Sequence, residues 1–217
     1  MNLYRISSPS FFNREVVSVA RDLLGKFFIK EEKNFLLAGK IVEVEAYDSS
    51  DPASHSFNGQ TPRNSVMFLR GGHLYVYFIY GVHYCCNVVT GKKGHGAAVL
   101  IRALEPVAGI QLLSARRFNT KSPSPSRLIN LLNGPAKICS AFSIDKAHNG
   151  LDLLAGNIYI ASEKSHFPAV SPSPSPENPA DELIVASKRI GITKSTRLLW
   201  RFYLKNNIYV SKNSIGK

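Results

Sequence analysis

The apolar positions along the chain predict one helix near the start and a largely β-stranded region after it. Apolar residues recur at helical spacing from Asn13 to Leu24, where Asn13 can cap the first turn and Gly25 can end the helix. Runs rich in β-branched and aromatic residues then predict strands at 27–30, 38–47, 74–80, 82–90 and 97–104. Turn residues at Gly81 and at 91–96 separate the last three runs, so we expect these strands to form an antiparallel meander.

The second half of the chain adds predicted helices and loops. The pattern predicts helices over 106–117 and 136–143, and the latter is entered through Asn133-Gly134-Pro135. Segments 122–126 and 171–179 are rich in Pro and Ser, and we expect them to be surface loops rather than domain boundaries. In the tail we expect a short helix from 182 onward and a loop around Gly191. Two strands are expected after it, around 200–203 and 208–210.

Length and composition limit the number of domains. The chain has 217 residues, of which 44% are hydrophobic, so it can bury a sizeable core, which excludes a wholly disordered or fibrous protein. No internal repeat is visible. We therefore expect residues 1–217 to form a single mixed α+β domain with a curved antiparallel β-sheet surrounded by helices.

Basic residues are concentrated in the middle of the chain. The net charge is +12, and residues 61–150 carry 11 basic and two acidic side chains. The basic residues are scattered rather than run together, as expected for phosphate contacts spread over a folded surface. This balance favours a polyanionic partner such as nucleic acid or an anionic membrane, and a well-solvated surface is the alternative.

The cysteines and the N-terminal sequence give no sign of secretion. Cys85, Cys86 and Cys139 are too few for a disulfide framework and lack the spacing of a zinc site, so we expect reduced core thiols. Residues 1–12 lack a basic region followed by a long apolar stretch, and no window approaches the roughly 18 apolar residues of a membrane span. We expect a cytoplasmic protein without a membrane partner.

A carboxylate, a phenol and an imidazole occur around the end of the predicted strand 38–47. Glu45 and Tyr47 lie at the strand end, and His55 follows in the polar loop 48–61. Loops held by rigid strands often carry functional groups, and these three side-chain types recur at active sites. Taken alone, this signal is weak, because an exposed strand end followed by a loop histidine gives the same pattern more often.

Aromatic residues are dense between Tyr75 and Tyr84. Four tyrosines within ten residues suit stacking on a nucleic-acid base, and core packing is the alternative. Alternation along the strand sends Tyr75 and Tyr77 to one face. Tyr80 lies beside Gly81 at a predicted turn, which makes it a candidate for a projecting ring.

Two polar residues interrupt the apolar strands, and several common catalytic motifs are missing. Asn87 and Arg102 must face solvent or a polar pocket, because an unpaired buried polar group is costly. Segment 91–96 lacks the Ser or Thr and the strand-to-helix setting of a phosphate-binding loop. The sequence also lacks a nucleophile elbow and a metal-spaced His/Cys set, so we expect neither a cofactor nor a metal.

A series of short motifs occurs in order between Phe11 and Val210. The motifs lie at 44–47, 54–56, 61–64, 67–68, 75–81, 100–106, 133–139, 189–191 and 200–203. Together they resemble the alkyladenine (3-methyladenine) DNA glycosylase family. Any one motif is unspecific, but the ordered series is specific.

The resemblance implies a monofunctional DNA glycosylase that acts in base excision repair. Such an enzyme flips an alkylated or deaminated purine out of double-stranded DNA and hydrolyses its N-glycosidic bond with an activated water. On this resemblance Glu45 is the general base, and Arg102 with the backbone near it positions the water. The protein is expected to act as a monomer.

The resemblance also assigns the residues around the base. Tyr47, His55 and Tyr77 are expected to enclose the flipped base. Tyr80 is expected to intercalate into the DNA, and Asn87 to hinder guanine through its exocyclic amino group. Physical chemistry agrees, since an extruded base leaves a gap that a side chain must fill, and aromatic rings attract a cationic alkylated purine.

Two other functions compete with this interpretation. A non-catalytic nucleic-acid binding module of related fold would explain the charge and the aromatic residues but not Glu45, since a carboxylate facing a polyanion is unfavourable. A bifunctional glycosylase/lyase needs an amine nucleophile, and no lysine occupies the matched pocket positions.

Overall fold

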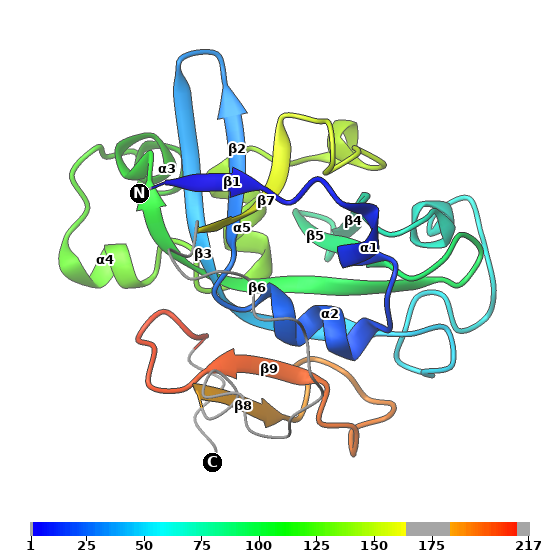
Figure 1. The fold of residues 1–217 in the computed structure, drawn as a ribbon. Coiled ribbons are helices and arrows are strands. Elements are labelled where there is room, and N and C mark those ends of the chain that lie inside the picture. The colour runs from blue at the N-terminus through cyan, green and yellow to red at the C-terminus, as the bar shows by residue number, and fades with distance from the viewer. Residues whose placement is uncertain (1, 164–182, 212–217) are drawn as a thin grey trace.

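An antiparallel sheet organises residues 2–163 and 183–211, which the computed structural model describes (Figure 1). The strand order is β1-β7-β2-β3-β6-β5-β4, and β9 pairs with both β3 and β8. The strands are β1 (Leu3–Arg5), β2 (Phe27–Glu32), β3 (Phe35–Tyr47), β4 (Leu74–Ile79), β5 (His83–Thr90), β6 (Ala97–Ala108), β7 (Ile158–Glu163), β8 (Ile184–Ser187) and β9 (Arg201–Leu204).

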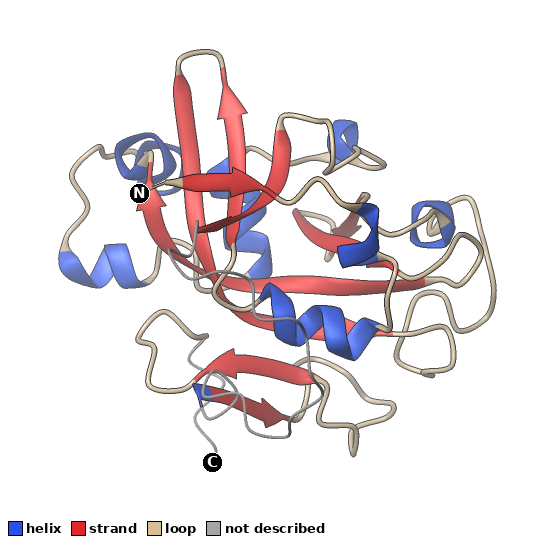
Figure 2. Ribbon diagram, in the orientation of Figure 1, coloured by secondary structure: helices blue, strands red, loops and turns tan. Residues whose placement is uncertain are grey.

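Strands β3 and β6 form the long central pair of the sheet. Their register shifts near Gly39 and again around Glu43, and such irregularities bend a strand pair. The two strands approach closely at the first shift, because a Cβ on Gly39 would lie 2.8 Å from the Cβ of Leu104. The bend carries β3 and β6 from the β2 hairpin to the opposite side of the molecule (Figure 2).

Helices surround this sheet and close its core. They are α1 (Pro9–Phe12), α2 (Val16–Leu23), η1 (Ser65–Phe68), α3 (Ile110–Phe118), α4 (Pro125–Ile129), α5 (Pro135–Phe142) and η2 (Lys146–His148). Helix α2 packs on β3 and β6, and α5 packs on β5 and β6 and also against α3. The apolar faces of these helices and strands form one large buried cluster. The predicted α+β class with an antiparallel sheet and surrounding helices is confirmed.

The predicted N-terminal helix has a different cap. Helix α2 begins at Val16, and the side chain of Glu15 accepts hydrogen bonds from the amides of Val17 and Ser18, at 3.0 and 2.8 Å. A carboxylate at this end also interacts favourably with the helix dipole. The predicted cap, Asn13, instead accepts the Gly71 amide at 2.9 Å and ties α1 to another loop.

The helix predicted over 106–117 is wrong at its start. Residues 106–108 extend β6, because they pair with the Ala38–Gly39 end of β3. Helix α3 starts only after Gly109, whose φ of +70° turns the chain out of the strand.

Predictions in the loops and the tail also need correction. Segment 122–126 is not a loop throughout, because Pro125 starts α4 behind the capping side chain of Ser124. The tail residues Ile184–Ser187 form a strand rather than the predicted helix, since they pair with β9. Residues 208–210 form a turn and not a strand. The predicted loop 171–179 lies outside the described residues.

Two further observations bear on the sequence predictions. Cys85, Cys86 and Cys139 are all buried and free, so the prediction of reduced core thiols is confirmed. Among the helices of residues 2–163 and 183–211, none has both the length and the apolar character that crossing a bilayer requires.

Candidate active site

One pocket of about 360 Å³ collects every residue that the sequence singled out for function. Its walls come from β3, the 48–61 loop, the β4–β5 hairpin, β6, the start of α5 and the segment after β8. The predicted residues in its lining are Glu45, Tyr47, His55, Tyr77, Tyr80, Asn87 and Arg102. These residues come from four separate segments, and the sheet brings them to one place.

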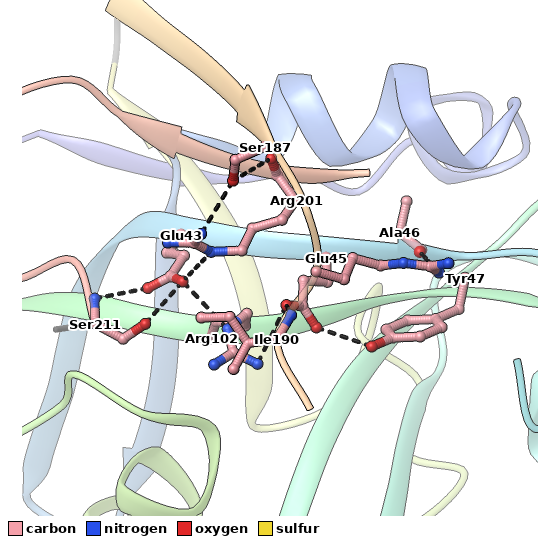
Figure 3. Close-up of polar contacts among 10 residues, drawn as sticks. Glu43, Glu45, Ala46, Tyr47, Arg102, Ser187, Ile190, Arg201 and Ser211 are labelled. Atoms are coloured by element: carbon pink, nitrogen blue, oxygen red, sulfur yellow. Dashed lines mark hydrogen bonds and ion pairs between the residues drawn. The ribbon is translucent and has the colours of Figure 1, made fainter. Parts of the chain in front are cut away.

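Strand β3 places a fully buried carboxylate against the pocket. One oxygen of Glu45 accepts the backbone amide of Ile190 at 2.7 Å and lies 3.3 Å from the Arg102 guanidinium (Figure 3). Its other oxygen accepts the Tyr47 hydroxyl at 2.8 Å. Because Glu45 is 0% exposed, these partners replace the water that would otherwise hold the charged form. A fixed carboxylate at a pocket wall can accept a proton or stabilise positive charge.

A second carboxylate lies behind the first. Glu43 is also 0% exposed, and it accepts hydrogen bonds from Nε of Arg102 at 3.2 Å and from Nε of Arg201 at 2.7 Å. Arg102 thus bridges Glu43 and Glu45. Burial alone would lower the pKa of Arg102, but the two carboxylates outweigh it and raise that pKa, so the guanidinium stays charged.

Aromatic rings and a histidine form the opposite wall. The rings of Tyr75 and Tyr77 stack with centroids 5.6 Å apart, and His55 meets Tyr77 edge-on at 4.6 Å. His55 Nδ1 lies 3.1 Å from the Tyr75 hydroxyl. Burial, together with the charge of Arg63, lowers the pKa of His55, so the imidazole is neutral at pH 7. Burial and the adjacent Glu45 raise the pKa of Tyr47, so this phenol keeps its proton.

The β4–β5 hairpin ends in a tight turn at the rim of the pocket. Tyr80 and Gly81 both have positive φ, +54° and +71°, as the two central residues of a mirror-image β-turn do, and the Val82 amide closes this turn on the Ile79 oxygen at 3.3 Å. The Tyr80 side chain is 83% exposed, and Phe78 and Val82 beside it are also exposed. The turn therefore presents apolar surface directly above the pocket.

Asn87 lies deeper in the same hairpin. It is buried, and its side-chain amide donates to the backbone oxygen of Tyr75 at 3.1 Å across the strand pair. The polar side chain that the sequence placed in an apolar strand thus has a partner and still borders the pocket. A ligand in the pocket can contact only the atoms of the Asn87 side chain that this hydrogen bond leaves accessible.

Comparison with known proteins identifies the family of this chain. The family model described as methylpurine-DNA glycosylase (MPG) matches residues 10–208. The chain belongs to the methylpurine-DNA glycosylase family. It is 47% identical over 202 residues to a protein of Carboxydothermus hydrogenoformans, covering 93% of this chain and 96% of that protein. A protein of Methanoculleus marisnigri is 48% identical over 203 residues, covering 94% and 97% respectively. Both relatives are provisionally named 3-methyladenine DNA glycosylase.

Membership in the methylpurine-DNA glycosylase family confirms the resemblance that the ordered motifs indicated. It also confirms the assignment to DNA glycosylases, a class of enzymes, over the non-catalytic module. Among residues 2–163 and 183–211, no group of three His, Cys, Asp or Glu side chains lies close enough to hold a metal ion.

Several residues that line the pocket were given no function from the sequence. They include Met67, Pro135, Ala136, Ile190 and Ile192. The contact of the Ile190 amide with Glu45 joins residues 145 positions apart, and a backbone donor leaves no side-chain signal. The only available signal was that three of the ordered motifs, at 67–68, 133–139 and 189–191, contain some of these positions.

Proposed function

We propose that this protein is a monofunctional glycosylase that rotates a damaged purine out of double-stranded DNA into the pocket and hydrolyses its N-glycosidic bond. The observation that carries the proposal is a buried carboxylate, Glu45, held at the wall of an aromatic pocket beneath an exposed hairpin tip. A base inside a stacked duplex is out of reach of such a carboxylate, so the base must leave the stack. We further propose a monomer acting in the cytoplasm.

Glu45 acts as the general base in this proposal. Its partners fix both oxygens, so the carboxylate is oriented before the substrate arrives. A water between Glu45 and the sugar gives its proton to the carboxylate as it attacks. The negative charge also stabilises the oxocarbenium character that develops on the sugar. Arg102, charged and 3.3 Å from Glu45, positions that water.

The aromatic wall selects the base. Tyr47, His55 and Tyr77 enclose it, and their rings attract a cationic alkylated purine. The lowered pKa of His55 matters here, because a neutral imidazole does not repel that cation. Asn87 opposes guanine, since a side chain against its minor-groove edge meets the exocyclic amino group.

The hairpin and the basic residues hold the DNA. Tyr80 enters the stack in place of the flipped nucleotide, which its exposure and apolar neighbours support. Arg63 is exposed and donates to the backbone oxygen of Phe78, so a cation lies beside the hairpin tip. Together with exposed basic residues such as Lys92 and Lys93, Arg63 provides phosphate contacts.

The decisive experiment measures base release from a panel of duplexes that carry 3-methyladenine, 7-methylguanine, hypoxanthine or ethenoadenine. We expect release of at least one base, with the abasic strand left uncut. Binding without release from any duplex would contradict the proposal and support a non-catalytic module. Trapping of a protein–DNA adduct by borohydride would contradict the monofunctional mechanism and indicate a lyase.

A further inference from the structure

The loop that supplies Ile190 is fastened at both ends to a single residue of β3. Nη1 of Arg189 donates to the backbone oxygen of Ala46 at 2.8 Å. The backbone amide of Ala46 donates to the oxygen of Trp200, also at 2.8 Å. Ala46 lies between Glu45 and Tyr47, so the loop is attached where the two pocket side chains leave the strand (Figure 3).

The side chain of Arg189 joins this loop to a second one. It is 0% exposed and forms an ion pair with Asp51, which is equally buried. Asp51 also accepts the amide of Ala53 at 3.0 Å, within the loop that carries His55. The guanidinium lies 4.6 Å from the ring centroid of Tyr47, on the strand between the two loops.

This ion pair is poorly suited to a purely stabilising role. Removing two charges from water is expensive, and the attraction repays that only when the remaining donors are satisfied. In the part of the chain that the structure describes, Nε and Nη2 of Arg189 are buried without a hydrogen-bond acceptor. Neither Arg189 nor Asp51 lines the pocket, so any effect on chemistry must pass through the residues that they hold.

We propose that Arg189, paired with Asp51, is a positioning residue that holds the Ile190 amide against Glu45. Ile190 follows Arg189 directly, so the fixed guanidinium limits where its N–H can point. That N–H donates to Glu45 Oε1 at 2.7 Å and sets the plane of the carboxylate. The inference rests on the proposed function of Glu45 and adds a residue that tunes its geometry.

The test compares three variants. Arg189→Met breaks the pair, and the double variant Asp51→Asn with Arg189→Met removes both charges, so that no unpaired charge stays buried if the single variant fails to fold. Replacing both partners of a buried pair in this way is often neutral for stability. The control is Glu32→Gln on β2, which breaks the ion pairs of Glu32 with Lys30 on the same strand and with Arg116 on α3. None of these three residues lines the pocket.

Three quantities are measured: the single-turnover rate of base release with enzyme in excess, the dissociation constant for lesion DNA, and hydrogen exchange of the Ile190 amide. In the double variant we expect the rate to fall roughly tenfold or more, since small misplacements of catalytic groups have such effects. We expect affinity to change by less than about threefold, because the pocket walls remain. The Ile190 amide should exchange faster, whereas the control should match the wild type in all three.

An unchanged rate in the double variant, at any melting temperature, would overturn the proposal. Equal losses of rate and affinity would also overturn it, because they would mean that the pair shapes the pocket rather than the carboxylate. If the wild type released no base from any duplex, the proposed function would fail. Hydrogen exchange does not depend on base release. An unchanged exchange rate of the Ile190 amide would therefore overturn the positioning role of Arg189 separately.

Discussion

Glu43 and Glu45 are two carboxylates on one strand with the same burial and opposite surroundings. Both side chains are 0% exposed, and both contact Arg102. Glu43 is enclosed by donors from Arg102, Arg201 and the backbone and side chain of Ser211. Glu45 accepts from Ile190 and Tyr47 and, unlike Glu43, lines the pocket.

This difference teaches that burial does not distinguish a carboxylate enclosed by the fold from one that borders a pocket. What differs is whether a side of the group faces a space that a substrate can enter. Glu43 on β3 binds Arg102 on β6, Arg201 on β9 and Ser211. Its charge therefore stabilises the contacts between these parts of the fold. The proposed base, Glu45, keeps a face that protein donors do not occupy. Substitutions should therefore separate stability from catalysis along this strand.

The largest effect is expected at Glu43. Glu43→Ala leaves Arg201 buried and facing no carboxylate, and breaking a buried pair in this way costs about 3–5 kcal/mol of unfolding free energy. Urea denaturation followed by circular dichroism measures it. A loss below about 1 kcal/mol would break the comparison, because Glu43 would then not be a structural centre.

The next effect is expected at Glu45 and concerns rate. Glu45→Gln keeps the shape and the hydrogen bond from Ile190 but cannot accept a proton, so single-turnover base release should fall roughly 100-fold or more. Affinity for lesion DNA should be retained. A normal single-turnover rate in this variant would show that Glu45 is not the general base, independently of the stability measured for Glu43→Ala.

Tyr80 extends the comparison to a residue that should affect function alone. Tyr80→Ser should weaken binding of lesion DNA by about 1–3 kcal/mol, the value of one stacking contact. Because the ring is 83% exposed, the melting temperature should stay close to that of the wild type. Fluorescence anisotropy and a thermal scan report the two quantities. Unfolding of this variant would show that Tyr80 is a core residue.

The smallest effect is a change in selectivity at Asn87. Asn87→Ser removes bulk at the minor-groove edge of the base, so release of 7-methylguanine should rise relative to hypoxanthine. The measured quantity is the ratio of the two single-turnover rates, with melting temperature as the control. Asn87 also donates to Tyr75, so both rates falling together at a constant ratio would make it a structural residue like Glu43.

Sequence patterns predicted the regions of strong periodicity and missed those decided by distant partners. The alternation in 74–80 and 82–90 gave β4, β5 and the turn at Tyr80, because a hairpin is a local structure. Pro106 continued a strand instead of starting a helix, since pairing with β3 outweighed its local preference. Residues Ile184–Ser187 became a strand for the same reason, through pairing with β9.

The same distinction between local patterns and distant partners holds for the residues of the candidate site. Side chains with chemical character, such as Glu45, His55 and Arg102, were identified from sequence, and they line one pocket. The groups that orient them were not identified, because the motif at 189–191 does not reveal that the Ile190 amide contacts Glu45 or that Arg189 pairs with Asp51, residues distant along the chain. Such groups become visible only when the chain is folded.

The contacts of β3 also set the order in which the protein can be completed during synthesis. Glu43 and Glu45 emerge from the ribosome early, whereas the donors from Ile190, Arg201 and Ser211 are translated more than 140 residues later. Until then the two carboxylates have only Arg102 and, for Glu45, Tyr47 among these partners, and the remaining donors that make their burial tolerable are missing. Strand β3 therefore cannot reach its final environment in a partly translated chain, and a nascent fragment carries the pocket motifs before the pocket is complete.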